Sequence, residues 1–450
     1  MTDRQRGEGA EGGPAPGAGA PGGGAPAGAA PKGAKREKIQ APRGTHDILP
    51  PGSGRWAAME RRTQDLMRRF GFEEIRTPVF EELKLFVRGV GEGSDIVRKE
   101  MYDFKDKGGR DLALRPEGTA SVARAAVEHG LLQPGRVVKL WYQGPMFRYD
   151  RPAAGRYRQF HQMGVEVLGS ASPLADLEAI QVFWAWLMEL GLTGLTLKLN
   201  SVGCPVCRPV YRERLREFLA PRLERLCGDC RERYERNPMR VLDCKVPSCR
   251  EQLAGAPAIL DSLGEECRTH FDELRAHLDS VGLPHVIDTG LVRGLDYYTK
   301  TAFEVHDDAL GAQSAVGGGG RYDGLVEEVG GPPTPGVGFS TGLERVLLSM
   351  EAGGSVALAP VSRPEYFVAT VDAAARPEAL RLLAALRARH WAEADLSGSS
   401  LKAQFRRADS LKAAKVVVLG PEEIARGVAR VKDMDTHEEK EVPLEELRAR

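Results

Sequence analysis

Apolar side chains recur at helical intervals in two parts of the chain. In the first part, the residues that fall near one face of a helix are Trp56, Met59, Leu66 and Phe70. Their spacing predicts an amphipathic helix over residues 56–70. A similar pattern predicts a second helix over about 173–190.

Shorter apolar runs have the length of strands. Strands are predicted over residues 137–142, 159–167 and 195–199. Strands and a glycine-rich loop are expected again over 286–340, followed by a helix through Met350. These elements indicate a folded domain of mixed α and β structure.

Composition divides the chain into parts. Residues 1–40 are nearly all Gly, Ala, Pro and charged residues and contain no Val, Leu or aromatic side chain. Such a segment cannot offset its chain entropy by burying apolar surface, so it is expected to be disordered. A Gly- and Pro-rich stretch at 353–364 predicts a linker. The expected folded domains are 41–355, with a charged, cysteine-rich helical insertion at about 203–285, and 364–450.

Strand and helix patterns alternate beyond the linker. The segments are EYFVATV, EALRLLAALRARH, SLKAQFRRADS and AKVVVLG. This order is typical of a small α/β unit with a largely parallel sheet.

Overall composition narrows the setting of the protein. Its 450 residues carry 63 basic and 63 acidic side chains, so net charge neither favours nor excludes a nucleic-acid partner. No apolar run has the length of a membrane span, and the N-terminal residues lack the apolar core of a secretory signal. Seven cysteines in such a chain indicate reduced thiols or metal ligands rather than a disulfide framework. We therefore expect a cytoplasmic protein with no membrane partner.

Residues 142–169 carry the most specific chemistry. They read YQGPMFRYDRPAAGRYRQFHQMGVEVLG, two strand-like runs around a loop. The loop supplies the guanidinium groups of Arg148, Arg151, Arg156 and Arg158. Guanidinium forks bind phosphate oxygens and stack on rings, so the loop suits a nucleotide. A solvated basic hairpin is the alternative. The GxxxxGK[ST] phosphate loop is absent from the sequence.

Glu117 and Thr119 follow a predicted strand, DLALR. On an extended segment, side chains two residues apart point the same way. A carboxylate and a hydroxyl placed in this manner can bind an ammonium group. A surface charge or a helix cap is the alternative for Glu117.

Residues 291–298, LVRGLDYY, bring Arg293, Asp296, Tyr297 and Tyr298 into one short window. This combination is unusual for a core strand. Shortly afterwards a run of four glycines precedes Arg-Tyr-Asp-Gly. Glycine lets a backbone approach a ligand closely, but the run has little specificity in a chain with 52 glycines.

The segment Gly338-Phe-Ser340-Thr-Gly342 matches the GxSxG pattern of a nucleophile elbow. Aspartate and histidine residues further along the chain could complete a triad, so a hydrolase is one alternative. Replacing Ser340 with Ala would abolish the activity of a hydrolase.

Two cysteine pairs have the spacing of structural zinc sites. The pairs are Cys204-x2-Cys207 and Cys227-x2-Cys230, separated by nineteen residues. Cys244 and Cys249 are possible replacement ligands. A zinc ion would stabilise an insertion whose own core is small, and ordinary reduced thiols are the alternative.

Together these segments resemble the class II aminoacyl-tRNA synthetases, and the histidyl-tRNA synthetases among them. GPMFR and QFHQ resemble motif 2, GVGFSTGLERVLL resembles motif 3, and LVRGLDYY and GGGGRYDG resemble the two histidine motifs. DLSGSSLKAQFRRAD and RVKDM resemble the anticodon-binding domain. The resemblance covers about residues 41–450. It implies an α+β catalytic domain with an antiparallel sheet and a helical insertion, plus a C-terminal α/β anticodon-binding domain.

The resemblance also implies how L-histidine is held. Glu117 and Thr119 match the residues that hold the α-amino group, and Glu166 and Tyr298 match those that bind the two imidazole nitrogens. The full implied set is Glu117, Gly118, Thr119, Gln162, Glu166, Tyr297 and Tyr298. A site that hydrogen-bonds both nitrogens rejects other residues by about 10⁴–10⁵-fold, so no editing domain is needed.

ATP would occupy the arginine-rich side of the implied site. Arg148 and Arg293 match the arginines at the α-phosphate, and Arg345 and Arg156 those at the distal phosphates, with Mg²⁺ neutralising the remaining charge. Histidine would attack the α-phosphate, and the histidyl-adenylate would pass its acyl group to the 3′ end of tRNA(His). Many relatives lack the cysteines, so zinc cannot be essential to this chemistry, and a structural zinc is the possible cofactor.

Partners follow from the same resemblance. Arg76-Thr-Pro78 resembles motif 1, which builds the dimer interface, so a homodimer is expected. The alternative is a regulatory paralogue that binds histidine without charging tRNA, although such paralogues usually lack the C-terminal domain. Ala153 stands where relatives commonly carry a Gln that reads the tRNA acceptor end. Contacts to the extra 5′ guanosine of tRNA(His) are therefore expected to differ here.

Overall fold

The computed structural model describes residues 38–449, except 92, 93, 95, 154, 293, 296 and 356–362. Nearly all of the tail predicted at 1–40 therefore lies outside the described residues. The segments on the two sides of 356–362 are presented separately below. None of the helices in the described part of the chain is both long and apolar enough to span a bilayer.

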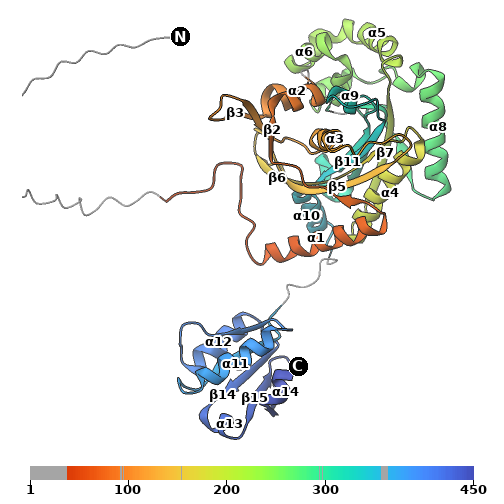
Figure 1. Cartoon of the computed structure of the whole chain (residues 1–450). Coiled ribbons are helices and arrows are strands. Elements are labelled where there is room, and N and C mark those ends of the chain that lie inside the picture. Colours follow the sequence, from red (N-terminus) through yellow and green to blue (C-terminus); the bar gives the residue numbers. More distant parts are fainter. Residues whose placement is uncertain are drawn as a thin grey trace, which may run out of the picture. The chain divides into compact units, whose positions relative to one another are not determined.

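An eight-stranded sheet runs through the body formed by residues 38–355 (Figure 1). Its strand order is β1-β5-β6-β11-β10-β9-β7-β8. Pairing is antiparallel throughout except at the two edges, where β1 and β8 pair in parallel. The strands are β1 (Glu73–Glu74), β5 (Val138–Phe147), β6 (Gln159–Leu168), β7 (Leu195–Gly203), β8 (His285–Ile287), β9 (Thr299–Asp307), β10 (Ala315–Arg321) and β11 (Gly336–Gly342). The predicted antiparallel catalytic sheet is thus confirmed.

Helices bury apolar residues on both faces of this sheet. The larger core contains side chains from α1 (Gly52–Arg69), α4 (Pro173–Glu189), α8 (Glu265–Ser280) and α10 (Leu343–Ala352). On the other face, α3 (Thr119–Glu128) and α9 (Leu325–Glu328) pack against β5. Helix α4 begins where predicted because Ser172 caps it, its Oγ accepting the Leu174 N–H at 3.2 Å.

A smaller antiparallel sheet has the strand order β2-β4-β3. Its last strand in sequence, β4, ends shortly before α3 begins. Its strands are β2 (Phe80–Glu82), β4 (Asp111–Leu114) and β3 (Tyr102–Lys105). Between β2 and β3 run α2 (Leu83–Val90) and a short π-helix, η1 (Ile96–Glu100). Phe86 of α2 and Ala120 of α3 share one buried cluster, so this sheet and the catalytic sheet are packed together.

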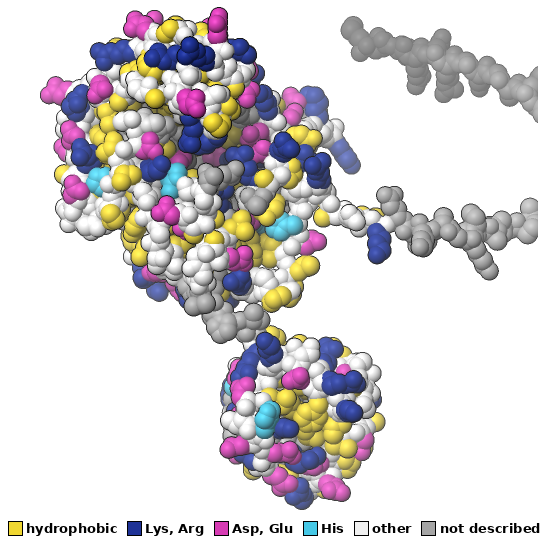
Figure 2. Space-filling view, turned by 180° about the vertical axis from the view of Figure 1, so that it is seen from behind, with side chains coloured by type: hydrophobic (Ala, Val, Ile, Leu, Met, Phe, Trp, Pro, Cys, Tyr) yellow, Lys and Arg dark blue, Asp and Glu magenta, His cyan; other side chains and the backbone are white. Residues whose placement is uncertain are grey.

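The insertion is helical, as predicted, and has a core of its own. Its elements are α5 (Cys207–Leu219), η2 (Ala220–Arg225), α6 (Gly228–Arg236), η3 (Pro238–Asp243), α7 (Pro247–Gln252) and η4 (Ile259–Ser262). Lys and Arg side chains gather over this end of the body, at the top of Figure 2. Helix α8 falls inside the predicted limits of the insertion, but its Phe271 and Leu274 pack into the larger core.

Residues 363–449 form a five-stranded sheet of order β13-β12-β14-β15-β16 flanked by helices. The prediction of a largely parallel sheet is wrong for half of it. β12 pairs in parallel with β13 and β14, whereas β15 and β16 add an antiparallel hairpin. The elements are β12 (Tyr366–Thr370), α11 (Arg376–Arg387), β13 (Ala392–Ala394), α12 (Leu401–Ser410), β14 (Lys415–Leu419), α13 (Pro421–Ala425), β15 (Val428–Asp433), β16 (Glu439–Pro443) and α14 (Leu444–Ala449).

Candidate functional site

Strand β6 separates the larger core from a polar pocket. Its residues Met163, Val165 and Val167 lie in the larger hydrophobic core. Because side chains alternate along a strand, Gln162 and Glu166 project from the opposite face. Both are buried although both are polar. The sequence pattern QMGVEVL therefore places two of the predicted ligands on the same face of the strand, with Gly164 between them.

Glycines on neighbouring elements make room for the large side chains of this pocket. A Cβ atom at Gly338 would lie 2.0 Å from Glu166 Oε2, and one at Gly164 would lie 2.5 Å from Tyr142 Oη. A Cβ atom at Gly118 would lie 2.2 Å from Cε2 of Tyr142. Real Cβ contacts are never so short, so the pocket depends on glycine at these three positions.

Glu166 is 1 % exposed, and the hydroxyl groups of Tyr322, Thr119 and Tyr142 lie near its carboxylate and favour its charged form. Tyr322 Oη donates a hydrogen bond to Oε2, whereas Oε1 has no partner among the described residues. Burial raises the pKa of Glu166 to about 8. Gln162 Oε1 and Tyr142 Oη are likewise buried without a hydrogen-bond partner in the described structure. Since buried polar atoms normally have partners, this group indicates a site for a polar ligand.

Glu117 lies at the beginning of α3 and is buried. Its carboxylate accepts the backbone N–H groups of Thr119 at 2.7 Å and Ala120 at 2.9 Å. An extended segment was predicted here, whereas the structure shows the start of a helix. The helix-cap alternative for Glu117 is confirmed. Burial raises the pKa of Glu117, and the two backbone hydrogen bonds oppose that shift. Each carboxylate oxygen keeps a second lone pair, so the cap leaves Glu117 able to bind an ammonium group.

Tyr297 and Tyr298 line the same pocket. The Tyr297 ring lies 4.7 Å from that of Tyr298 and 5.7 Å from that of Tyr322, measured between centroids. Burial raises the pKa of Tyr297, and the charges of Glu117 and Glu166 raise it further, which places both carboxylates near it. Arg293 lies outside the described residues, as does Asp296, so the role of Arg293 stays a prediction.

Arg148 directly follows β5, next to the pocket. Its Nε donates to the Pro116 carbonyl at 2.8 Å, and its guanidinium carbon lies 5.3 Å from the centroid of the Phe160 ring. Burial lowers the pKa of Arg148, while the charges of Glu100 and Glu117 act in the opposite direction. The guanidinium is thus fixed close to Glu117, between the polar pocket and the arginine-rich loop.

Arg345 and Arg156 form a second basic group. Arg345 Nη1 lies 3.7 Å from where a Cβ atom of Gly155 would be, so the loop passes over α10 at this point. Burial lowers the pKa of Arg345, and the charge of Arg156 lowers it further. Two guanidinium groups that repel each other in this way form a natural anion site. Arg156 also pairs with Asp150 at 3.3 Å.

The other two arginines of the loop have different surroundings. Arg158 lies over the Tyr149 ring at 4.0 Å and donates to the Asp150 carbonyl at 3.3 Å, so it stiffens the loop. Arg151 is exposed. The loop therefore presents two of its four arginines, Arg148 and Arg156, toward the candidate site.

Ser340 lies in the middle of β11, where it pairs with Gly164 on one side and Gly318 on the other. A nucleophile elbow needs its serine on a sharp turn between strand and helix. The hydrolase alternative is therefore wrong.

The four cysteines predicted as one zinc site do not come together. Cys204 and Cys207 gather with Cys267, whereas Cys227 and Cys230 gather with two other cysteines. The two C-x2-C pairs begin different helices, α5 and α6, of the insertion. Spacing alone could not show that each pair recruits its partners from later in the chain.

Several residues of the site were missed at the sequence level. Tyr142 and Tyr322 lie within recognised motifs but were given no role. Glu344 accepts the His161 backbone N–H at 2.9 Å and contacts His161 Nδ1 at 2.9 Å, which ties α10 to β6. The signal that could have located Glu344 is its position directly before Arg345 in the first turn of a helix.

Gly118→Ala tests the dependence of the pocket on close approach. The new Cβ would displace the Tyr142 ring, so we expect a loss of about 1–3 kcal/mol in the free energy of unfolding. Denaturant unfolding measures this change. Gly324→Ala is the matched control, because nothing lies within 4 Å of its Cβ position. Equal stability of the two variants would contradict the geometry described above.

Comparison with known proteins gives a consistent result for both parts of the chain. The family model described as histidyl-tRNA synthetase matches residues 44–346, and the model described as anticodon binding domain matches 355–450. A protein named histidine–tRNA ligase from Desulforamulus reducens is 54 % identical over 411 residues, covering 90 % of this chain and 97 % of that protein. One of the same name from Desulfitobacterium hafniense is 51 % identical over 410 residues, covering 91 % and 96 %. Among solved structures, apo histidyl-tRNA synthetase from S. aureus matches with a TM-score of 0.78 and 38 % identity, covering 92 % of this chain and 99 % of that one.

Proposed function

The chain belongs to the histidyl-tRNA synthetase family, and we propose that it ligates L-histidine to tRNA(His) at the pocket beside β6. One observation carries the assignment of that site. A buried carboxylate, Glu166, keeps one oxygen without a partner, and Gln162 on the same face of β6 is also buried with an unpartnered oxygen. Such a pocket suits a small ligand with hydrogen-bond donors, next to a triphosphate.

Histidine fits the polar half of the pocket. Its imidazole N–H would donate to Glu166 Oε1, and Tyr298 would bind the other ring nitrogen. The α-amino group would lie on Glu117 and Thr119, whose cap geometry holds the carboxylate in place before substrate arrives. The amide of Gln162 would help to hold the same substrate, with Gly118 and Tyr297 completing the wall.

ATP fits the basic half. Arg148 would bind the α-phosphate together with the predicted Arg293, and Arg345 and Arg156 would bind the distal phosphates. ATP enters as its magnesium complex, in which the ion neutralises part of the phosphate charge. The histidine carboxylate attacks the α-phosphate, histidyl-adenylate forms and pyrophosphate leaves. The protein contributes chiefly by orienting the reactants and stabilising the charge that develops on phosphate oxygens.

We also propose that the protein acts as a homodimer. Arg76, Thr77 and Pro78 line a groove of about 730 Å³ whose wall includes Leu85 and Val127. A groove of mixed apolar and charged character at the motif 1 segment is where a second copy would bind. Sedimentation equilibrium measures this directly, and a mass of one chain at micromolar concentration would contradict it.

The charging reaction separates this function from that of a histidine-binding regulatory paralogue. The purified chain should support histidine-dependent ATP–pyrophosphate exchange and attach labelled histidine to tRNA(His). As a control, tRNA(His) lacking its 3′-terminal adenosine should leave exchange intact and abolish charging. Histidine binding without exchange would establish the paralogue instead. The α/β unit at 363–449 lies within the match to an anticodon-binding domain, which supports the ligase over the paralogue. The proposed location is the cytoplasm, where tRNA is charged.

Recognition of the tRNA acceptor end is tested with the same assay. Ala153 and Arg156 exchange two backbone hydrogen bonds, at 3.1 and 2.9 Å, which form the tip of the arginine loop. A side chain as short as that of Ala153 cannot reach a base edge, so other contacts would have to read the extra 5′ guanosine. Comparing tRNA(His) with and without this nucleotide shows whether such contacts exist.

A further inference from the structure

All seven cysteines of the chain lie in a segment of 64 residues, from Cys204 to Cys267, and the structure sorts them into two clusters. In each cluster the sulfur atoms lie within 4.8 Å of one another. One cluster consists of Cys204, Cys207 and Cys267, and the other of Cys227, Cys230, Cys244 and Cys249. The second, called the four-sulfur cluster below, has the ligand number of a closed tetrahedral metal site.

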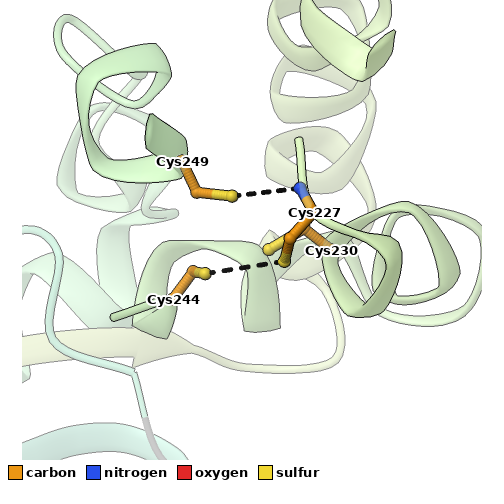
Figure 3. Close-up of side chains that lie close together, drawn as sticks. All are labelled: Cys227, Cys230, Cys244 and Cys249. Carbon is orange, nitrogen blue, oxygen red and sulfur yellow. Dashed lines mark hydrogen bonds between the residues drawn. The ribbon is translucent and has the colours of Figure 1, made fainter. Parts of the chain in front are cut away.

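The four sulfurs converge from three short elements (Figure 3). Cys227 precedes α6 and Cys230 lies in its first turn, while Cys244 directly follows η3 and Cys249 lies in α7. Cys227 Sγ and Cys244 Sγ are 3.9 Å apart. A zinc ion with four sulfurs at about 2.3 Å requires sulfur–sulfur distances of about 3.8 Å. This edge of the cluster therefore has nearly the length required, and the other sulfur–sulfur distances are at most 4.8 Å.

One backbone hydrogen bond and several basic neighbours in sequence would stabilise thiolates in the four-sulfur cluster. The backbone N–H of Cys227 donates to Cys249 Sγ at 3.2 Å, an interaction that stabilises negative charge on sulfur. Three of the four cysteines are followed directly by a basic residue, namely Arg231, Lys245 and Arg250. Basic neighbours offset the net double negative charge of a zinc ion with four thiolates.

Other fates of four clustered cysteines fit less well. A disulfide needs a sulfur–sulfur distance of about 2.05 Å, whereas all seven cysteines are free. An iron–sulfur cluster is also held by four cysteines, but its inorganic core keeps the thiolates further apart than these are. Carboxylate and imidazole ligands are absent from the cluster, which argues against hard cations.

We propose that Cys227, Cys230, Cys244 and Cys249 bind one structural zinc ion. The ion joins α6, η3 and α7, which together have little apolar surface of their own, and so fixes the fold of the insertion. It takes no part in the proposed reaction, and the inference does not depend on that reaction.

The metal would also hold two contacts between the insertion and the catalytic site. Helix α6 starts at the metal and carries Glu232, which pairs with Arg98 of η1 at 2.8 Å. At the end of η1, the Glu100 carbonyl accepts the N–H of Tyr149 in the arginine loop. Loss of the zinc ion would therefore be expected to disturb the arginine-rich loop, which is proposed to bind ATP.

The second contact involves η3, which lies between Cys230 and Cys244 in sequence. Met239 and Arg240 of η3 line a cavity of about 40 Å³ together with Tyr298. Arg240 also faces Gly294, since a Cβ atom there would lie 3.2 Å from Arg240 Nη1. The histidine-binding loop thus rests on a segment that is held at both ends by proposed zinc ligands.

Metal analysis of the full chain tests the proposal. Protein expressed in zinc-supplemented medium and purified without chelator should contain about one zinc ion per chain. Cys227→Ser should reduce the zinc content at least fivefold, and Cys227→His should restore it, because imidazole replaces thiolate in many zinc sites. Cys267→Ser, in the three-sulfur cluster, is the matched control and should keep the zinc of the wild type.

A second measurement keeps the test independent of whether variants fold. Cobalt added to the metal-depleted wild type should give the absorption of a tetrahedral thiolate complex, and zinc should displace it. Absence of zinc from the wild type together with no such absorption would overturn the proposal. So would loss of zinc in Cys267→Ser but not in Cys227→Ser, since the ion would then belong to the other cluster.

Discussion

Replacing Glu166 with Gln should lower kcat/KM for histidine in pyrophosphate exchange by at least about 100-fold. Removing one partner of a buried, charged hydrogen bond costs roughly 2–5 kcal/mol, and Glu166 is 1 % exposed. The amide keeps the shape of the side chain but presents no charge to the imidazole. Exchange kinetics at varied histidine and saturating ATP measure the loss, and exposed Glu327→Gln is the control. Activity within about threefold of the wild type, less than 1 kcal/mol, would refute the assignment of Glu166.

The pH dependence gives this prediction a signature that a purely structural role would lack. Because the pKa of Glu166 is raised to about 8, the carboxylate of the free enzyme becomes more populated as pH rises toward that value. kcat/KM for histidine should therefore rise with pH through this range and then level off. Glu166→Gln should lack the rise. Tyr322→Phe removes a donor that lowers this pKa, so its profile should shift to higher pH.

The raised pKa of Glu166 also affects the stability of the protein when no substrate is bound. The pKa of Glu166 is higher in the folded than in the unfolded chain, so its contribution to stability is complete below about pH 4.3 and declines as pH rises through about 8. Histidine bound as proposed would offset this loss by donating to the carboxylate. Under this proposal the free protein carries a destabilising charge that its substrate neutralises.

Arg148→Ala should reduce kcat of pyrophosphate exchange by about 10²–10³-fold, the effect of removing one preorganised donor from a developing oxyanion. Arg148 Nε is already engaged with Pro116, which leaves the outer edge of the guanidinium to face the α-phosphate. Arg148→Lys keeps the charge without the fork and should recover only part of the rate.

Two comparisons make the Arg148 result interpretable. Arg151→Ala removes an exposed arginine from the same loop and should leave exchange near the wild-type rate. Thermal unfolding of Arg148→Ala shows how much of any loss comes from the missing contact to Pro116. Full activity in Arg148→Ala would place the α-phosphate elsewhere.

Sequence alone predicted the periodic elements well. The helix expected at 56–70 runs over Gly52–Arg69, and the strands at 137–142 and 159–167 are found and extend further. β5 was underestimated because Gly144 and Pro145 look like a strand end, whereas in the structure they pair in register with Gln162 and His161. The β15–β16 hairpin was not predicted, because its segment is strongly charged and has little apolar alternation.

The site was predicted residue by residue from motifs, but its physical basis was not. The sequence offered a helix cap for Glu117 only as an alternative, and nothing in a linear pattern shows that Glu166 is held by Tyr322, 156 residues away. The cysteines illustrate the same limit. Cys227 and Cys230 gather with Cys244 and Cys249, which the sequence offered only as possible replacement ligands. Long-range contacts of this kind follow from the packing of elements, and local spacing does not encode them.

The glycines that face the pocket bear on attempts to redesign it. Gly118, Gly164 and Gly338 contribute no functional group, yet each leaves the volume that a pocket side chain fills. A saturation mutagenesis screen would score all three as intolerant because of the space they leave, whether or not the substrate touches them. Enlarging the site for bulkier histidine analogues would have to start from the tyrosines, because the neighbouring backbone has no side chains left to trim.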